Sequence, residues 1–363
     1  MQSFGQYLQN LAEQELRLPE VNADACVYSF YDRSDCNACV QACPSQAWIL
    51  DDDSLGLDSD ACDGCGLCVP ACPGGALSLD FPYVIRQFGG HLMALFACSQ
   101  SGVDRNLKQL PCIDALGLRQ LLLLYNSGIR HLLVARGECS DCQYHQSSGL
   151  DQRLQQLNVL LQERNQPAMK MMLRSGKLWE KIYRTDEVIS RGTQLSRRQF
   201  LRGKNKAIRQ NMLLIDPLNL AESQTVPAGE LLPETTAAEV HWPWAPNLDA
   251  SQCSGCDACI NLCPTGALQL IWDEENTAAA YQLNPAKCNG CGICVAVCES
   301  KAMSLQNFAL SSVHDVTLKQ QNCSACGNSF HLPREEGQMQ NKLCRICETR
   351  NHNRNLFQVL TDD

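Results

Sequence analysis

Aromatic side chains are scarce in this sequence of 363 residues, of which they make up 6%. Charged residues account for 19%, whereas hydrophobic residues reach 45%. This composition excludes an intrinsically disordered chain and a collagen-like repeat. The length allows two or three domains and more than one buried core.

The sequence also lacks a long hydrophobic run. Its most apolar stretch, residues 118–135, is interrupted by polar residues such as Arg119, Asn126 and Arg130, and no run approaches the roughly 18 apolar residues of a membrane-spanning helix. The first twenty residues have neither the basic nor the apolar region of a secretory signal. We therefore predict a cytoplasmic protein without a membrane span.

Signatures of catalysis are missing as well. We find no glycine-rich nucleotide fingerprint, no catalytic triad and no substrate-pocket motif, and the seven histidines show no paired spacing. No catalytic residue is predicted, which favours a non-catalytic subunit over an enzyme.

Cysteine is present in excess. The 24 cysteines fall along the chain into six groups of four. Such a density indicates disulfide bonds in an oxidising compartment or metal ligation in a reducing one, and the recurring C-x2-C spacing favours metal.

Three of the six groups follow the pattern C-x2-C-x2-C-x3-C, which is the spacing of [4Fe-4S] ligands in bacterial ferredoxins. Proline follows the last cysteine in two of them, and Glu299 follows it in the third. A fourth group keeps the second half of the pattern, with its first cysteine moved back to Cys26 by an insertion. Short gaps wrap one loop around a cluster, and glycines such as Gly64 and Gly290 permit close approach. Zinc knuckles or disulfides are the alternative and fit this pattern less well.

In two-cluster ferredoxins the fourth cysteine of each run binds the cluster of the other run. This crossing predicts four [4Fe-4S] clusters. The ligand sets are Cys26, Cys36, Cys39 and Cys72; Cys62, Cys65, Cys68 and Cys43; Cys253, Cys256, Cys259 and Cys298; and Cys288, Cys291, Cys294 and Cys263.

On these motifs, residues 24–80 and 249–306 each resemble a bacterial-type dicluster ferredoxin module, and the chain resembles a polyferredoxin. The resemblance implies a pseudo-twofold pair of helices with short hairpins. Plausible strands lie at residues 47–50, 77–79, 267–271 and 302–305. We place the two modules at residues 1–82 and 241–310.

Residues 83–175 separate the two modules and differ from them in their pattern of apolar residues. Apolar runs at 91–97, 118–125 and 129–135 predict a strand, a helix and a strand, hence an α/β domain with a short parallel sheet. Four cysteines would meet at the carboxyl edge of this sheet, where ligands usually bind. They are Cys98, Cys112, Cys139 and Cys142.

These four thiols predict a fifth iron–sulfur site of the [2Fe-2S] type, with buried structural cysteines as the alternative. The segments C-S-Q-S-G-V-D from Cys98, L-P-C to Cys112 and D-C-Q-Y around Cys142 carry a further likeness. They resemble the iron–sulfur delta subunit that links methyl-viologen-reducing hydrogenase to heterodisulfide reductase.

Basic residues concentrate between residues 151 and 210, where 14 Lys and Arg stand against 5 Asp and Glu. A solvated helical face explains this as well as a docking surface for an acidic partner does, and nucleic-acid binding ranks third. We assign residues 176–240 to a basic helical segment followed by a proline-containing linker with Pro217, Pro227 and Pro233.

The segment Ser196-Arg197-Arg198 mimics a twin-arginine export signal, but no apolar stretch follows it. Together with Trp242-Pro243-Trp244 and the second module, it resembles the accessory ferredoxin of periplasmic nitrate reductase operons, a cytoplasmic protein.

The last group, Cys323, Cys326, Cys344 and Cys347, consists of two C-x2-C pairs with 17 residues between them. This spacing predicts a zinc ribbon at residues 311–363. A rubredoxin-like mononuclear iron site has the same ligands and is the alternative.

The predicted fold class is thus α+β, with two dicluster modules flanking an α/β domain and a C-terminal zinc ribbon. We expect an iron–sulfur protein that relays single electrons to or from a partner oxidoreductase, such as a molybdenum or tungsten enzyme, a hydrogenase or a ferredoxin. The alternative is an accessory or maturation factor for a molybdoenzyme of the nitrate reductase or formate dehydrogenase type. A redox-sensing regulator is a third hypothesis and would need nucleic-acid affinity.

Overall fold

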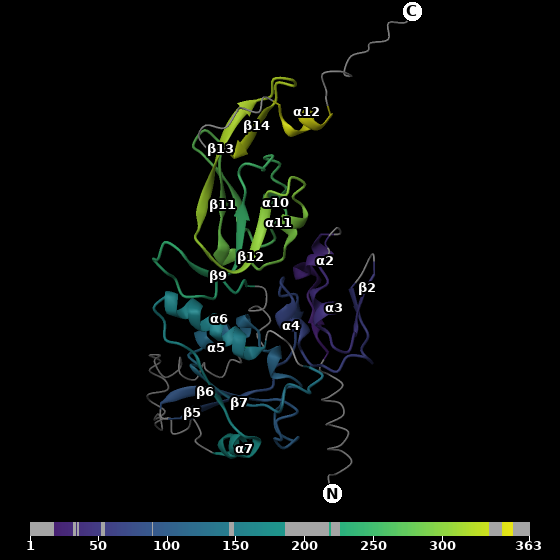
Figure 1. Ribbon diagram of the computed structural model, residues 1–363, viewed down its shortest axis with the longest axis vertical. Helices are drawn as coiled ribbons and strands as arrows, with labels where there is room; N and C mark the ends of the chain where they lie inside the picture. Colours follow the sequence, from purple (N-terminus) through teal and green to yellow (C-terminus); the bar gives the residue numbers. More distant parts are fainter. Residues whose placement is uncertain are drawn as a thin grey trace, which may run out of the picture. The chain divides into compact units, whose positions relative to one another are not determined.

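The computed structural model describes residues 18–31, 34, 36–51, 55–88, 90–144, 149–185, 218, 226–333 and 343–350. The chain forms two compact units, Met1–Ala237 and Ala238–Asp363 (Figure 1). The twin-arginine-like segment at Ser196, most of the basic strip beyond Thr185 and Pro217 of the linker lie outside the described residues. None of the helices in the described ranges combines the length and apolar character needed to cross a bilayer.

The first unit begins with short elements around the first eight cysteines. These elements include two small antiparallel sheets, in which β1 pairs with β4 and β2 pairs with β3. The elements are β1 (Glu20–Val21), η1 (Ala23–Ala25), α2 (Val27–Phe30), α3 (Ala38–Ala42), β2 (Trp48–Leu50), β3 (Leu55–Leu57), α4 (Cys68–Ala71) and β4 (Leu77–Ser78).

A four-stranded sheet of order β5-β6-β7-β8 forms the rest of this unit. Its elements are β5 (Val84–Phe88), β6 (His91–Ala97), η2 (Ile113–Ala115), α5 (Leu118–Asn126), β7 (His131–Ala135), α6 (Leu150–Glu163), β8 (Lys170–Leu173) and α7 (Gly176–Arg184). The predicted strand, helix and strand correspond to β6, α5 and β7.

The sheet is mixed, whereas the sequence predicted a parallel one. Strands β6, β7 and β8 are parallel, but β5 pairs antiparallel with β6. The pairing of Phe88 with His91 leaves a two-residue turn in which Gly90 has a φ of 84°. This tight turn suits a hairpin, which places β5 at the edge beside its sequence neighbour.

Side chains of β6 and β7 are buried on both faces of the sheet. Leu95 and Leu133 face Trp179 of α7, and they form one core with it. Phe96 and Leu132, one position along each strand, are fully buried on the opposite face. Helices α5 and α6 lie on one side of the sheet and α7 on the other, so both faces are covered (Figure 1).

The second unit holds the other dicluster cysteines and the C-terminal four. Its elements are β9 (Val240–Leu248), α10 (Ala258–Asn261), β10 (Leu268–Trp272), β11 (Ala278–Leu283), η5 (Pro285–Lys287), α11 (Ile293–Ala296), β12 (Met303–Ser311), β13 (His314–Asn322), β14 (Ser329–Pro333) and α12 (Arg345–Arg350). Strand β9 pairs with β12, and a second sheet has the order β10-β11-β13-β14.

The ribbon is continuous with the module that precedes it, although the sequence predicted a separate domain from residue 311. Strand β13 pairs with β11 of the module on one side and with β14 of the ribbon on the other. Leu318 of β13 belongs to the same core as Tyr281 of β11. A shared strand and a shared core make ribbon and module one structural unit.

Candidate metal centres

The third cysteine of each dicluster run lies in a short helix. Cys39, Cys68, Cys259 and Cys294 are found in α3, α4, α10 and α11 respectively. Residues before these helices adopt positive φ, as at Gly66 and Gly292, both 76°. These turns fold the loop back on itself, as close wrapping around a cluster requires.

The structure brings the first crossed set together. Burial raises the pKa of Cys39 to about 11, with a further contribution from the charges of Cys72 and Cys36. Burial also raises the pKa of Cys72, where Cys26 and Cys36 add to the rise. Cys26 thus lies beside the other three despite the insertion in its run.

The second set also converges. Burial raises the pKa of Cys68 to about 12, and the charges of Cys62, of Cys39 from the first set and of Cys43 raise it further. The pKa of Cys65 is raised too, first by burial and then by Asp63 and Cys68. Cys43 therefore lies near Cys68 of the run that follows it.

The second unit repeats this arrangement. Burial raises the pKa of Cys253 to about 11, and Cys256 and Cys298 contribute through their charges. Burial likewise raises the pKa of Cys288 to about 12, with contributions from Cys291 and Cys263. The four-residue ligand sets stay predictions, and the proximities agree with them.

Backbone amides point at the last cysteine of three runs. The N–H groups of Ala47, Ala76 and Ala302 donate to Sγ of Cys43, Cys72 and Cys298 over 3.3, 3.3 and 3.2 Å. In each case the donor is the alanine four residues after the cysteine. Hydrogen bonds to sulfur are among the factors that set cluster potentials.

Two tryptophans lie against the cluster loops. The side chain of Trp48 hydrogen-bonds Cys68, which opposes the rise of that thiol's pKa caused by burial. Trp244 of β9 covers Gly290, where an added Cβ would lie 2.2 Å from Cε2 of the indole. Sequence reasoning used Trp244 only for a family likeness and did not assign it a role at the cluster loop.

The donor sets fit iron–sulfur clusters. Buried thiols crowded against one another ionise with difficulty by themselves, because each thiolate lacks water and repels its neighbours. Iron supplies the positive charge that stabilises four thiolates in such a place. When bound, the clusters supply one-electron chemistry, while the protein holds the thiolates, directs amides at sulfur and excludes water.

The middle group has two buried and two half-buried cysteines. Cys98 and Cys112 are 7% and 8% exposed, whereas Cys139 and Cys142 are half-buried. Burial raises the pKa of Cys112 to about 12, and Asp114, Cys142 and Cys98 add to it. The N–H of Gly137 donates to Sγ of Cys98 over 3.4 Å. The charges of Cys98 and Cys142 thus act on both Cys112 and Cys139, and the four-thiol site stays a prediction.

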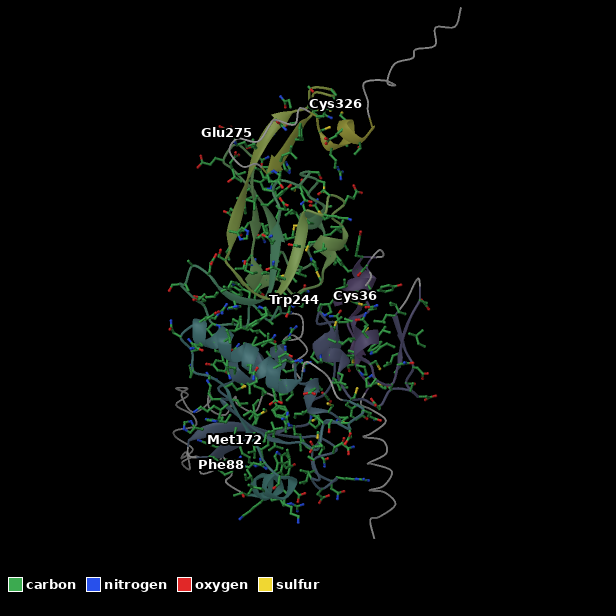
Figure 2. The ribbon with its side chains drawn as sticks, in the orientation of Figure 1. Cys36, Phe88, Met172, Trp244, Glu275 and Cys326 are labelled. Atoms are coloured by element: carbon green, nitrogen blue, oxygen red, sulfur yellow. The ribbon has the colours of Figure 1, made fainter. Side chains whose placement is uncertain are left out.

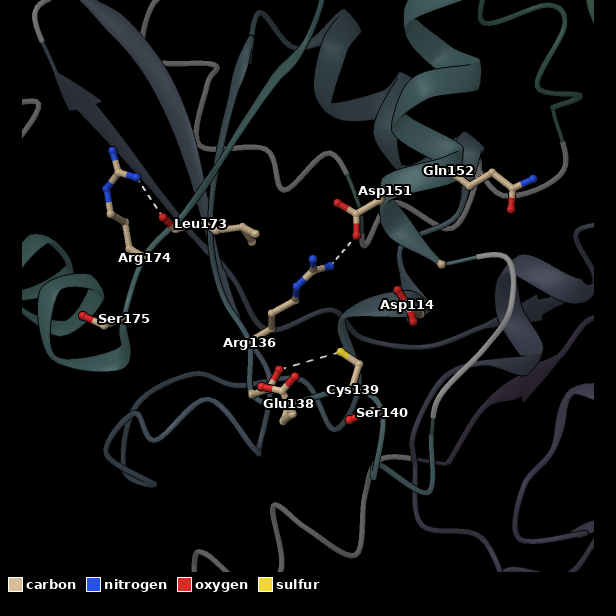
Figure 3. Close-up of a pocket in the computed structure, with 12 residues that line it drawn as sticks. Asp114, Arg136, Glu138, Cys139, Ser140, Asp151, Gln152, Leu173, Arg174 and Ser175 are labelled. Carbon is tan, nitrogen blue, oxygen red and sulfur yellow. Dashed lines mark hydrogen bonds and ion pairs between the residues drawn. The ribbon is translucent and has the colours of Figure 1, made fainter.

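A cavity opens beside Cys139 at the carboxyl ends of β7 and β8 (Figure 3). Arg136 points across it to an ion pair with Asp151, in the first turn of α6. Arg174 and Ser175 line it from the end of β8. This side of the middle group is accessible from solvent, unlike the side of Cys112.

The C-terminal cysteines form a tighter group than the others. Sγ atoms of Cys323, Cys326, Cys344 and Cys347 all lie within 4.8 Å of one another, and those of Cys326 and Cys344 are 3.8 Å apart. Four sulfurs about 2.3 Å from one tetrahedral metal would be about 3.8 Å apart. Figure 2 places Cys326 in the turn between β13 and β14. The site therefore fits a single metal ion.

The ribbon backbone also favours the thiolate form of Cys323. The N–H of Cys344 donates to Sγ of Cys323 over 3.2 Å, and this bond is the main cause that lowers the pKa of Cys323 to about 6. A cysteine that is ionised near neutral pH binds metal without first losing a proton.

Three residues between the ribbon and a cluster loop were missed by sequence reasoning. Asp257, Tyr281 and His331 form one hydrogen-bonded group. The side chain of His331 is 17% exposed. No sequence motif links these residues, because they come from three separate elements.

Comparisons with known proteins agree with the two modules. Residues 34–77 and residues 252–302 each match the 4Fe-4S dicluster domain. The first match begins after Cys26, so it does not cover that ligand. No curated protein matches the chain. With two dicluster domains that bind four [4Fe-4S] clusters, the chain is an iron–sulfur electron-transfer protein.

Proposed function

We propose that this protein is a cytoplasmic relay that carries single electrons between a donor and a partner oxidoreductase. The observation that carries the proposal is a contact within the first unit. Cys65 and Leu67 of a cluster loop form one buried core with Cys112 and Tyr144 of the middle segment, and Cys142 packs against it. Ligands of a cubane and thiols of the middle group are thus in one cluster of side chains.

The middle group is proposed to hold a [2Fe-2S] centre. Its four thiols, two of them buried, supply the ligands of such a centre. One electron lost by this centre would be gained by the neighbouring cubane through the Cys65 contact. Tyr144 strengthens the junction, because its hydroxyl hydrogen-bonds Asp63, which lies two residues before Cys65.

We further propose that the partner exchanges electrons on the Cys139 side. This side opens into the cavity beside Arg136, while the opposite side of the group is buried against the cubane. The family likenesses suggest a molybdenum or tungsten enzyme, a hydrogenase or a ferredoxin as partner. The C-terminal site is proposed to hold zinc.

The test is anaerobic stopped-flow reduction by partners recovered in a pull-down from native extract. In the wild type, a true donor reduces both the middle centre and the cubanes. In Cys139→Ser the same donor should reduce the cubanes far more slowly, while dithionite, which reaches each cluster from solvent, reduces them as before. Equal cubane reduction by the donor in both proteins would exclude this entry route.

The same experiment separates the relay from a maturation factor. A maturation factor would bind the cofactor-free partner and show little steady-state electron flux. Rapid and repeated cluster reduction by the mature partner supports the relay.

A further inference from the structure

Asp257 occupies a backbone position that glycine occupies in the other two regular runs. It follows the second cysteine of its run, as Gly66 and Gly292 do, and its φ is 58° against 76° for both glycines. A side chain in this left-handed region costs about 1 kcal/mol that glycine avoids. Backbone geometry alone thus favours glycine here, so the carboxylate needs another explanation.

The Asp257 carboxylate is held by two partners. The hydroxyl of Tyr281, which is 1% exposed, donates to Oδ1, and Nε2 of His331 donates to the same oxygen over 2.9 Å. An ionised carboxylate has only acceptor sites, so two donors on one oxygen suit its charged form. A carboxylate charge therefore lies one residue from Cys256.

Most of the compensating charge and bonding comes from the ribbon. His331 is in β14, between the two cysteine pairs of the ribbon, and its ring packs edge-on against Tyr281 at 5.9 Å. Arg345, directly after Cys344, also contributes its positive charge to Asp257. Both residues are positioned by the fold that the four C-terminal cysteines close.

The ribbon backbone lies directly on the same cluster loop. A Cβ added to Gly255 would lie 2.0 Å from the carbonyl oxygen of His331. The N–H of Cys323 donates to the carbonyl of Asn328 over 2.9 Å and closes the turn that carries β14. Movement of the ribbon would therefore change both the backbone contact on Gly255 and the hydrogen bond that His331 donates to Asp257.

We propose that the ribbon metal site sets the reduction potential of the cubane predicted at Cys253, Cys256, Cys259 and Cys298, with His331 as the positioning residue that couples them. The proposal goes beyond electron relay and depends only on that cubane being present. An uncompensated negative charge near a cluster disfavours the added electron. When the N–H donor of His331 and the positive charge of Arg345 offset the charge of Asp257, reduction becomes easier.

The test is an EPR-monitored redox titration of the full chain, prepared without oxygen. His331→Phe keeps an aromatic ring but removes the donor, so we expect the reduction equilibrium of one cubane to fall about tenfold, or about 59 mV for one electron. His331→Gln keeps an N–H donor and should restore most of the potential. Asp257→Asn removes the charge, tolerates positive φ, and should shift the same cubane in the opposite direction.

Ribbon occupancy is tested by Cys326→Ser and Cys344→Ser, which weaken the metal site. Both should shift the potential of the same cubane in the direction of His331→Phe. Thr317→Ala is the matched control, because Thr317 is exposed on the same strand β13 and faces away from the side on which Gln320 pairs with His331. This control should leave all potentials unchanged.

Two results would overturn the proposal. The first is an unchanged set of four cubane potentials in the ribbon variants, and the second is a shift of the same sign in His331→Phe and Asp257→Asn. If His331→Phe lost a cluster, Asp257→Asn and Cys326→Ser would decide the question. Failure of the relay with any candidate donor would not affect these measurements, which use chemical reductants.

Discussion

Gly290 and Gly292 lie two residues apart in one cluster loop and both have positive φ, yet their surroundings differ. At Gly290 an added Cβ meets the indole of Trp244, whereas at Gly292 nothing lies within 4 Å. The strain of a left-handed side chain applies to both positions, but the steric clash applies to one. Glycine is thus favoured by backbone strain at both sites, and by the indole as well at Gly290.

Gly290→Ala should be more harmful than Gly292→Ala. Both variants lose about 1 kcal/mol through backbone strain, and Gly290→Ala loses about 1–3 kcal/mol more because the indole or the loop must move. The measurement is the temperature at which cluster absorbance is lost under anaerobic heating. Equal midpoints in the two variants would contradict the role of Trp244 as a cover of this loop.

Cys65→Ser should remove one cubane and destabilise the N-terminal module. Cys65 is 6% exposed, and its module has little core besides the clusters. Iron and sulfide analysis would show the loss, and far-UV circular dichroism would show the destabilisation. Cys139→Ser serves as the control, since it should leave all four cubanes in place.

Helix α7 shows how a single residue can attach an element to the sheet. Trp179 is fully buried against Leu95 and Leu133, and its Nε1 donates to the carbonyl of Leu133 over 3.3 Å. Leu178, its neighbour in the helix, is 43% exposed. The helix therefore docks through one face.

Trp179→Ala should lower the stability of the middle sheet by about 3–5 kcal/mol, because it removes a large buried side chain and leaves a cavity. Leu178→Ala, on the same helix, should change it by less than about 0.5 kcal/mol. Anaerobic urea unfolding would compare the stabilities of the two variants. It is followed by far-UV circular dichroism, because the substitution removes a tryptophan and would alter fluorescence directly. A similar effect of both substitutions would mean that α7 is not docked through Trp179.

At the scale of the whole molecule, the six cysteine groups separate by geometry. The C-terminal sulfurs lie within 4.8 Å of one another and suit one metal ion. Fifteen of the sixteen dicluster cysteines lie in the two matched domains, and Cys26 precedes the first of them. The middle four join a sheet edge to one of these loops through Cys112.

Anaerobically prepared protein should contain about 16 iron and 16 sulfide in its cubanes, with about two more of each in the middle centre. Metal and acid-labile sulfide analysis of one sample checks both amounts. Cys139→Ser should lose the two extra irons and sulfides, and Cys344→Ser should lose one metal ion without sulfide. Zinc in every site and no sulfide would contradict the cluster assignment.

Much of this organisation could be predicted from local patterns. The spacing of the cysteines from Cys62 to Cys72 predicts cluster ligands by itself. The apolar runs at β6, α5 and β7 likewise predict a strand, a helix and a strand. The hairpin of β5 was missed because its signal is the short turn at Gly90. The continuity of β13 with β11 was missed because strand pairing between distant segments leaves no trace in either segment alone.

The sequence by itself determined which residues can hold metal, because ligand chemistry depends on residue type and close spacing along the chain. Tertiary structure alone decided what surrounds each site. It placed Tyr144 at the junction of Cys65 and Cys112, Trp244 over Gly290, and His331 against Asp257. These contacts join residues far apart in the chain, and only packing of the complete fold brings their side chains within reach.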